Sequence, residues 1–211
     1  MPAPDIPVPA RIAALPFDKL RGFHVPWFVA WVDGKPEFRG ADFAKFKLAV
    51  KERRCWVCGD KLTRMMTFVA GPMCGLNRTS SEPPCHTECA RYSVRVCPFL
   101  TRPDMDRRER GMEKYETCIS GEMIRRNPGV ALLWTTKSYA LFRDGKGGVL
   151  LRMGPPEALE WWAEGRAATR AEVEESVRTG LPALEELARL QPGAMEVLAA
   201  MVARYPELYP A

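Results

Sequence analysis

The stretch Cys55-Trp56-Val57-Cys58-Gly59 decides how this chain folds, because it places two thiols three positions apart in a tight turn. A second pair with the same spacing, His86-Thr87-Glu88-Cys89, follows after 27 intervening residues. Two close pairs of soft or borderline ligands are how proteins build a closed tetrahedral Zn²⁺ site. The sequence therefore predicts one structural zinc ion held by Cys55, Cys58, His86 and Cys89.

The remaining cysteines leave one alternative open for the second pair. Cys85 competes with His86, since Cys85 and Cys89 would lie on one face of a helix at i,i+4 spacing. Cys74 is a candidate reactive thiol whose pKa Arg78 could lower, but no spare histidine is available as its base. The chain has seven cysteines and no export signal, so metal binding is favoured over disulfides.

The segments that flank the ligands predict the local structure around the metal. Gly59 suits the turn after the first pair. A strand is expected over 63–71, with a return segment over 73–77 completing a hairpin, and a helix from near Cys85 to Val96 that ends at Cys97-Pro98. This order of turn, hairpin and ligand-bearing helix resembles a treble-clef zinc finger over about residues 53–96.

Outside this region, hydrophobic periodicity and turn residues predict the other elements. Asp33-Gly34 indicates a hairpin between 27–32 and 35–39, and Asp42 is a helix N-cap. Strands are expected over 130–135, 139–143 and 149–153, and helices over 155–164, 169–180, 182–190 and 194–204.

These elements predict an α+β protein with a small antiparallel β body, a treble-clef zinc site and a helical C-terminal region. The expected organisation is an extended proline-rich arm over 1–26, a β-rich zinc-binding body over 27–154, and a helical region over 155–211 that packs on the body.

Charge is unevenly distributed along the chain. Residues 155–211 contain five Arg, no Lys and ten Glu, a net charge of −5, while the whole chain carries +5. The first 154 residues are therefore strongly basic, which favours an acidic partner such as nucleic acid. The candidate phosphate-binding residues are Arg53, Arg54, Arg78, Arg107, Arg108, Arg110, Arg125 and Arg126. Acidic residues interleaved at 104–113 weaken this interpretation, because mixed signs usually make a self-paired, solvated surface.

Targeting signals are lacking in the sequence. No apolar run approaches the ~18 residues that a membrane helix needs. The first nine residues contain four prolines and neither a basic cluster nor an apolar core, unlike a secretory signal. We therefore expect a cytoplasmic protein that does not bind membranes.

Several enzymatic interpretations fail on the residues that they require. An HNH-type nuclease shares the treble-clef scaffold but needs a histidine base, and the chain has only His24 besides His86. His86-Thr87-Glu88 matches the H-x-E of zinc deaminases, but no P-C-x-x-C follows it. The polar loop 77–82 could bind a phosphate near the N-terminus of a helix, although capping is the more common role of such residues.

Six stretches resemble a group of uncharacterised proteins from bacteria and their phages: 54–59, 68–74, 77–78, 82–86, 126–130 and 165–170. This resemblance covers most of the chain and implies a genomic setting but no activity. We therefore expect a non-enzymatic zinc module that binds nucleic acid. The alternatives are a regulatory factor that binds a protein, and an enzyme that acts on a small phosphorylated substrate through Cys74 or the loop 77–82.

Overall fold

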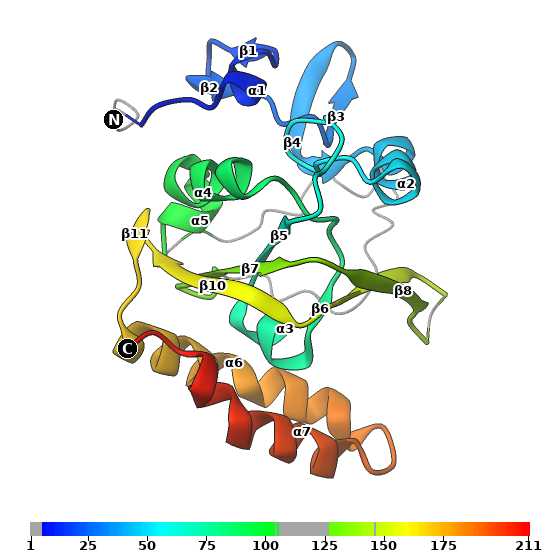
Figure 1. The fold of residues 1–211 in the computed structure, drawn as a ribbon, viewed down its shortest axis with the longest axis vertical. Helices are drawn as coiled ribbons and strands as arrows, with labels where there is room; N and C mark the ends of the chain where they lie inside the picture. Colours follow the sequence, from blue (N-terminus) through cyan, green and yellow to red (C-terminus); the bar gives the residue numbers. More distant parts are fainter. Residues whose placement is uncertain (1–5, 104, 106–126, 146) are drawn as a thin grey trace.

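A four-stranded antiparallel sheet forms the centre of the computed structural model, which describes residues 6–103, 105, 127–145 and 147–211 (Figure 1). The strand order is β11-β10-β7-β5. The strands span Met66–Ala70 (β5), Ala131–Thr136 (β7), Pro156–Ala163 (β10) and Arg166–Ala167 (β11). All six residues of β7 are buried, so this strand is covered on both faces.

The two faces of the sheet carry two separate hydrophobic cores. Leu132 and Trp134 of β7 contribute to one core, together with Phe68 of β5. Ala131 and Leu133, which alternate with them, contribute to the other core together with the cysteines of the predicted metal site. Successive side chains of a strand point to opposite faces, so this alternation assigns one core to each face.

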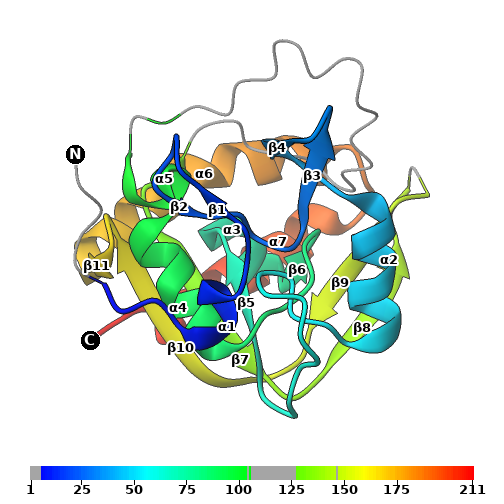
Figure 2. The same ribbon diagram turned by 90° about the horizontal axis from the view of Figure 1, so that it is seen from above.

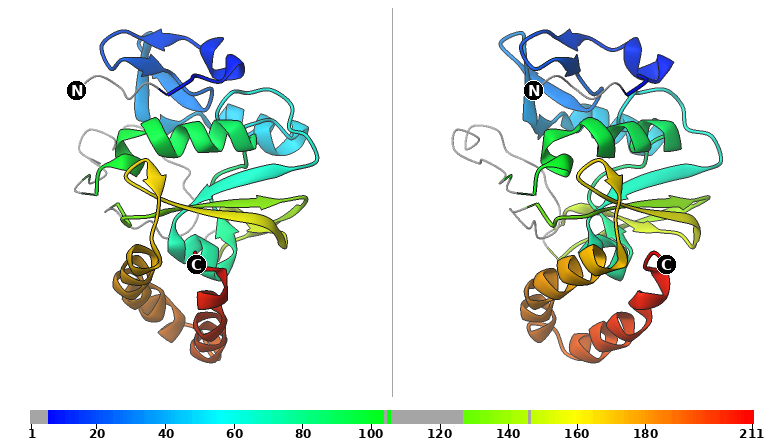
Figure 3. Two further views of the ribbon diagram at one scale, coloured as in Figure 1. Left: turned by 60° about the vertical axis from the view of Figure 1, so that its left-hand side comes forward. Right: turned by 90° about the vertical axis from the view of Figure 1, so that its left-hand side faces the viewer.

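Helices cover the first core at one pole of the molecule (Figure 3). They are α3 (Pro72–Asn77), α6 (Arg170–Arg189), α7 (Ala194–Arg204) and a short 3₁₀ turn at Tyr205–Leu208. We call α6, α7 and this turn the helical pole. The Tyr205 hydroxyl donates a hydrogen bond to the Pro72 carbonyl at 2.6 Å, which joins the C-terminal turn to α3.

The second core is covered by α4 (Thr87–Val96), α5 (Pro98–Thr101) and an N-terminal layer (Figure 2). This layer contains α1 (Ala10–Ala13), the hairpin β1–β2 (Phe17–Asp18 and Phe23–His24), the hairpin β3–β4 (Val29–Val32 and Lys35–Ala41) and α2 (Phe43–Glu52). As predicted, the Asp42 carboxylate caps α2 by accepting hydrogen bonds from the Ala44 and Lys45 amides.

A three-stranded sheet lies beside the central sheet, in the order β6-β9-β8. Its strands are Thr79–Ser80 (β6), Tyr139–Arg143 (β8) and Val149–Met153 (β9). The turn between β8 and β9 contains a hydrogen bond from the Gly148 amide to the Asp144 carboxylate at 2.7 Å. The two strands pair antiparallel and therefore form a hairpin.

The α+β class with small antiparallel sheets and C-terminal helices is confirmed, but four local predictions are wrong. Residues 155–164 are predicted as a helix, whereas 156–163 form strand β10, paired with β7. The segment 73–77 belongs to helix α3 instead of a hairpin strand. The helices predicted over 169–180 and 182–190 are one helix, α6. The arm over 1–26 is not simply extended, since it contains α1, β1 and β2.

Within the described part of the chain, no helix has both the length and the apolar character needed to cross a membrane.

Candidate metal centre

Four side chains from two distant segments meet in the second core. Cys55, Cys58, His86 and Cys89 are all buried, and one ligand atom of each lies within 4.8 Å of the ligand atoms of the other three. The Cys58 Sγ and His86 Nδ1 atoms are 3.4 Å apart. Bond lengths of about 2.0–2.3 Å around a tetrahedral ion place neighbouring ligand atoms about 3.5 Å apart. The donor set and its spacing therefore fit a four-coordinate metal site.

The turn at the first pair orients its thiols through backbone contacts. The Cys58 amide points at Cys55 Sγ at 3.4 Å, and the Gly59 amide donates to the Cys55 carbonyl at 2.9 Å. Gly59 has a φ of 82°, and a Cβ atom there would lie 2.7 Å from the Trp27 ring. The turn therefore needs glycine for its left-handed backbone conformation and for the close approach of Trp27.

The second pair is placed by a short β-bridge that precedes α4. Thr67 of β5 and Cys85 exchange two backbone hydrogen bonds of 2.8 Å. This bridge fixes His86 as the N-cap residue of α4, and Cys89 follows in the first turn of that helix. The His86 amide also points at Cys55 Sγ at 3.4 Å, which links the two ligand pairs directly.

The imidazole of His86 is oriented by its own second nitrogen. Nε2 lies 3.0 Å from the Lys61 carbonyl oxygen, while Nδ1 faces the thiols. A carbonyl oxygen only accepts hydrogen bonds, so Nε2 carries a proton and Nδ1 is the nitrogen left to offer a lone pair to a metal ion. A hydrogen bond of this kind is the usual outer contact of a metal-binding histidine.

The thiols influence one another electrostatically. Burial opposes ionisation of Cys55, but hydrogen bonds from Cys58, Cys85, Cys89 and His86 lower the pKa of this thiol. The hydrogen bond with Cys55 raises the pKa of Cys58 to about 11 and raises that of Cys89 as well. Without a cation, the group therefore favours a single thiolate. A divalent cation would stabilise all three thiolates, because its charge offsets their mutual repulsion.

The alternative ligand Cys85 is not a member of the group. It lies outside α4, so the i,i+4 relation to Cys89 does not apply. Its thiol donates to the Thr67 carbonyl at 3.2 Å. Cys74 is on α3, the helix that covers the first core. Burial raises the pKa of its thiol, which is the opposite of the shift that activates a nucleophile. Cys118 lies outside the described residues.

Residues that the sequence did not indicate close the outside of the metal centre. Arg11 of α1 forms ion pairs with Asp60 at 3.0 Å and with Glu88 at 2.9 Å. Asp60 follows the first ligand pair and Glu88 lies within the second, so one arginine spans both. The neighbouring Ile12 is buried against the same core. No ligand-type spacing marks these contacts, because they depend on how the N-terminal layer folds over the site.

The polar loop 77–82 forms its own internal contacts. The Asn77 carboxamide accepts a hydrogen bond from the Thr79 amide at 3.0 Å, and the Ser80 hydroxyl donates to the Glu82 carbonyl at 2.8 Å. Arg78 donates to the Met153 carbonyl at 3.1 Å. These contacts fit the loop-fixing role weighed for this segment and leave Arg78 committed to the protein, whereas the start of α4 has no side-chain cap.

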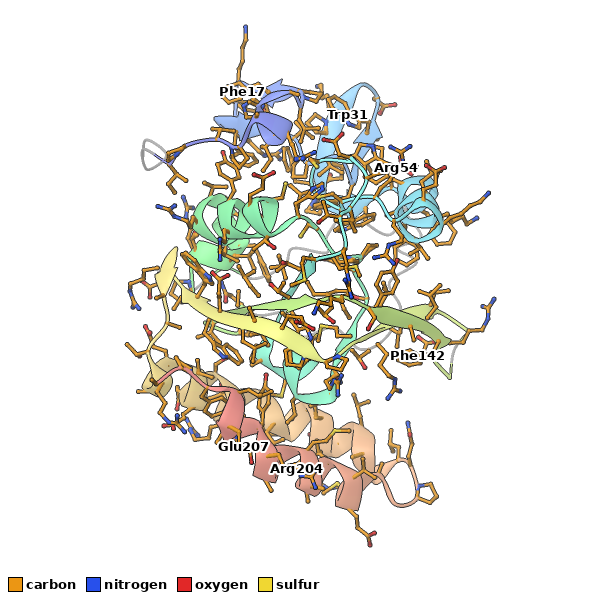
Figure 4. The ribbon with its side chains drawn as sticks, in the orientation of Figure 1. Phe17, Trp31, Arg54, Phe142, Arg204 and Glu207 are labelled. Atoms are coloured by element: carbon orange, nitrogen blue, oxygen red, sulfur yellow. The ribbon has the colours of Figure 1, made fainter. Side chains whose placement is uncertain are left out.

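Three of the eight predicted phosphate-binding arginines, Arg53, Arg54 and Arg78, fall in the part of the chain that the structure describes. Arg53 and Arg54 are adjacent to the metal centre, and Arg54 pairs with Glu52 at 2.7 Å (Figure 4). Arg78 follows α3 and contacts β9 through the Met153 carbonyl. The other five, Arg107, Arg108, Arg110, Arg125 and Arg126, fall outside the described residues.

Four further cations lie on the two segments that flank residues 53–54. Lys47 and Lys51 lie one turn apart on α2, and Lys61 and Arg64 lie on the segment that runs beside residues 53–54. All four are exposed, and none has an ion pair among the described residues. We call Lys47, Lys51, Arg53, Lys61 and Arg64 the basic patch. The sequence analysis missed it because the members are separated along the chain.

Comparison with protein-family models, with curated proteins and with solved structures gave no match.

Proposed function

We propose that this protein is a non-enzymatic module in which a structural Zn²⁺ ion holds a basic surface in shape for binding nucleic acid. The observation that supports the zinc assignment is the buried group of three thiols and one imidazole. Thiolate and imidazole ligands favour Zn²⁺ over harder cations. Protein side chains supply all four positions, which is typical of a structural ion and leaves none for a reacting water.

The path of the chain around the site supports the treble-clef assignment. A glycine-terminated turn provides the first two ligands, and the start of α4 provides the others. Between them, the bridge from Thr67 to Cys85 stands in the position of the usual hairpin. The helix α3 that interrupts this path is a departure from the simplest form of that motif.

The zinc assignment is tested by metal analysis of protein purified without added metal. We expect one zinc per chain in the wild type by native mass spectrometry and elemental analysis. Cys89→Ser should lose the metal, while Cys74→Ser, which removes a thiol outside the group, should keep it. A zinc-free wild type that is fully folded would exclude the structural role.

The basic patch supports nucleic acid as the partner. Cations without acidic partners keep their full charge available, and phosphate contacts depend on such charges. Lys47 lies 4.5 Å from the exposed Phe43 ring, so an aromatic surface for base stacking adjoins the patch. This juxtaposition favours single-stranded nucleic acid over a duplex.

Binding can be measured by fluorescence anisotropy with single-stranded and duplex oligonucleotides of DNA and RNA. We expect affinity to fall as salt rises, and the double variant K51E/K61E to lose at least about tenfold at low salt. Arg178→Glu combined with Arg189→Glu is the matched control, because it makes the same change in net charge on the helical pole. Equal losses in both double variants, or no salt-sensitive binding by the wild type, would contradict this proposal while leaving the zinc assignment intact.

A further inference from the structure

Helix α7 has an unusual composition for its position at the surface. Of the residues Ala194–Arg204, only Glu196 and Arg204 are charged, and the other nine are apolar. A helix that is apolar around its whole circumference is normally buried on all sides. Yet α7 lies at the outside of the helical pole, and only Leu198 is fully buried (Figure 3).

Most of the exposed residues of α7 are apolar: Met195 and Val197 lie on opposite flanks of the helix, and the alanines at 199, 200 and 203 lie between them beside Glu196. Val197 is 55% exposed and Met195 is 38% exposed, while Leu190, in the turn before the helix, is 79% exposed. Between α7 and α6 runs a shallow groove of about 300 Å³, whose apolar lining includes Leu181 and Ala203. Exposed apolar surface of this kind on an element with no other task marks a protein interface.

The two charges of α7 identify the occupant of this surface. Glu196 lies in the first turn and Arg204 at the last position, eight residues later, and neither forms an ion pair among the described residues. If a second α7 packs antiparallel with a twofold axis at Ala200, Glu196 faces Arg204 of the partner subunit at each end. The same register sets Ala200 on the axis, against Ala200 of the partner subunit.

We propose that α7 is the interface of a symmetric homodimer, in which two copies pair these helices antiparallel. A twofold interface must be complementary to itself, and α7 meets that condition in charge. The alanines at 199, 200 and 203 allow the helix axes to approach closely, since small side chains bring backbones together. The interface lies at the pole opposite the basic patch, so a dimer presents two patches facing away from each other (Figure 1).

The association can be measured on the zinc-loaded full chain by sedimentation velocity over a concentration range that reaches millimolar. The wild type should shift from monomer to dimer as concentration rises. E196R places two arginines at each end of the interface and R204E places two glutamates there. Each single variant should therefore weaken the dimer at least about tenfold.

The decisive experiment combines these variants. The double variant E196R/R204E exchanges the charges and should restore the wild-type dimer. An equimolar mixture of E196R and R204E should form a heterodimer, because each arginine then faces a glutamate at both ends. Glu186→Arg, an equal change on the outward side of α6, is the control and should dimerise as the wild type does.

A protein that is monomeric throughout this range would overturn the proposal. It would also be overturned by a dimer that all four charge variants leave unchanged, or by single variants that weaken the dimer without rescue in the mixture. Unchanged helical content by circular dichroism in every variant establishes that loss of association is not loss of folding.

Discussion

The two nitrogens of His86 have different roles: one is the candidate metal ligand, and the other fixes the orientation of the ring. One faces the thiols and the other donates to the Lys61 carbonyl, on the segment that carries the basic patch. This hydrogen bond makes the orientation of the ring depend on the backbone beside residues 53–54. A change in the ligand is therefore also a change in how that surface segment is held.

We predict that His86→Cys retains zinc, because a fourth thiolate completes an ordinary Cys₄ site. His86→Ala should lose zinc, while Cys85→Ala should keep it and lose only the hydrogen bonds of that thiol to the Thr67 carbonyl and to Cys55. Elemental analysis of the three purified variants distinguishes these cases. Zinc loss in Cys85→Ala with retention in His86→Ala would show that the ligand set is wrong.

Zinc binding should release protons, since Cys58 and Cys89 have raised pKa values in the metal-free group. At neutral pH these two thiols are protonated and must ionise to bind the ion, whereas the pKa of Cys55 is lowered. Raising the pH removes this competition, so the apparent affinity should increase with pH and fall in acid.

Titration calorimetry in buffers of different ionisation enthalpy measures this release directly. We expect about two thiol protons per zinc, with a further fraction from His86, whose pKa is also raised. An affinity that is constant from pH 6 to pH 8 would mean that the thiols are already ionised or do not bind the metal.

The ligands were predictable because the spacing of side chains along the chain is itself the signal. Cys55, Cys58 and Cys89 needed no tertiary information, whereas Cys85 and His86 could be separated only once the bridge to Thr67 placed the start of α4. The Lys61 contact had no signal at all, since every residue has a backbone carbonyl.

At the scale of elements, tertiary pairing overrides local preference in β10. The run from Pro156 to Ala163 contains two alanines, two glutamates and one leucine, which favour helix, yet it pairs along β7 as a strand. The sheet buries Trp161 on one face, and Trp162 packs against the other core. The two adjacent tryptophans are explained by the strand, because successive side chains of a strand point to opposite faces of the sheet.

Helix α6 shows the opposite error, because Gly180 and Pro182 are expected to end a helix and instead lie within a single one. Gly180 packs against the Met73 side chain, where a Cβ atom would come within 3.1 Å of it, so close packing explains the glycine. Pro182 lies in the same helix at an exposed position. Both residues have low intrinsic helix propensity, but propensity does not include the tertiary packing that stabilises α6 over its full length.

The start of α6 contains a capping box and permits a quantitative test. The Thr169 hydroxyl accepts a hydrogen bond from the Glu172 amide, and the Glu172 carboxylate accepts one from the Thr169 amide at 2.8 Å. Thr169→Ala should lower the free energy of unfolding by about 1 kcal/mol in urea titrations, whereas Thr169→Ser should be nearly neutral. Equal effects of the two substitutions would show that the hydroxyl is not what stabilises the helix.

At the scale of the whole molecule, the candidate metal site lies in only one of the two cores. The N-terminal layer packs on the first ligand pair through Trp56, which stacks on Phe28 and contacts the edges of Trp27 and Phe46. The helical pole packs on the opposite face of the sheet and includes none of the ligands. Removal of the ion should therefore affect the two sides of the molecule unequally.

We predict that a chelator increases hydrogen exchange first over residues 17–62 and α4, while β10 and α6 stay protected. Loss of the ion separates the ligand pairs and exposes Trp56, so tryptophan emission should also shift to longer wavelength. Exchange measured by mass spectrometry with and without chelator resolves the two regions. Simultaneous loss of protection in α6 and α4 would show that the two cores unfold as one unit.

The burial of β7 on both faces limits how short a fragment of this chain can be and still fold around the candidate metal site. Helix α4 rests on Ala131 and Leu133, and a chain of hydroxyls joins Thr67 to Thr87 and to Thr135. A peptide limited to residues 53–96 would keep every ligand but lose the floor beneath its helix. Because β5 already lies within that peptide, a graft of this centre into another scaffold needs β7 in addition.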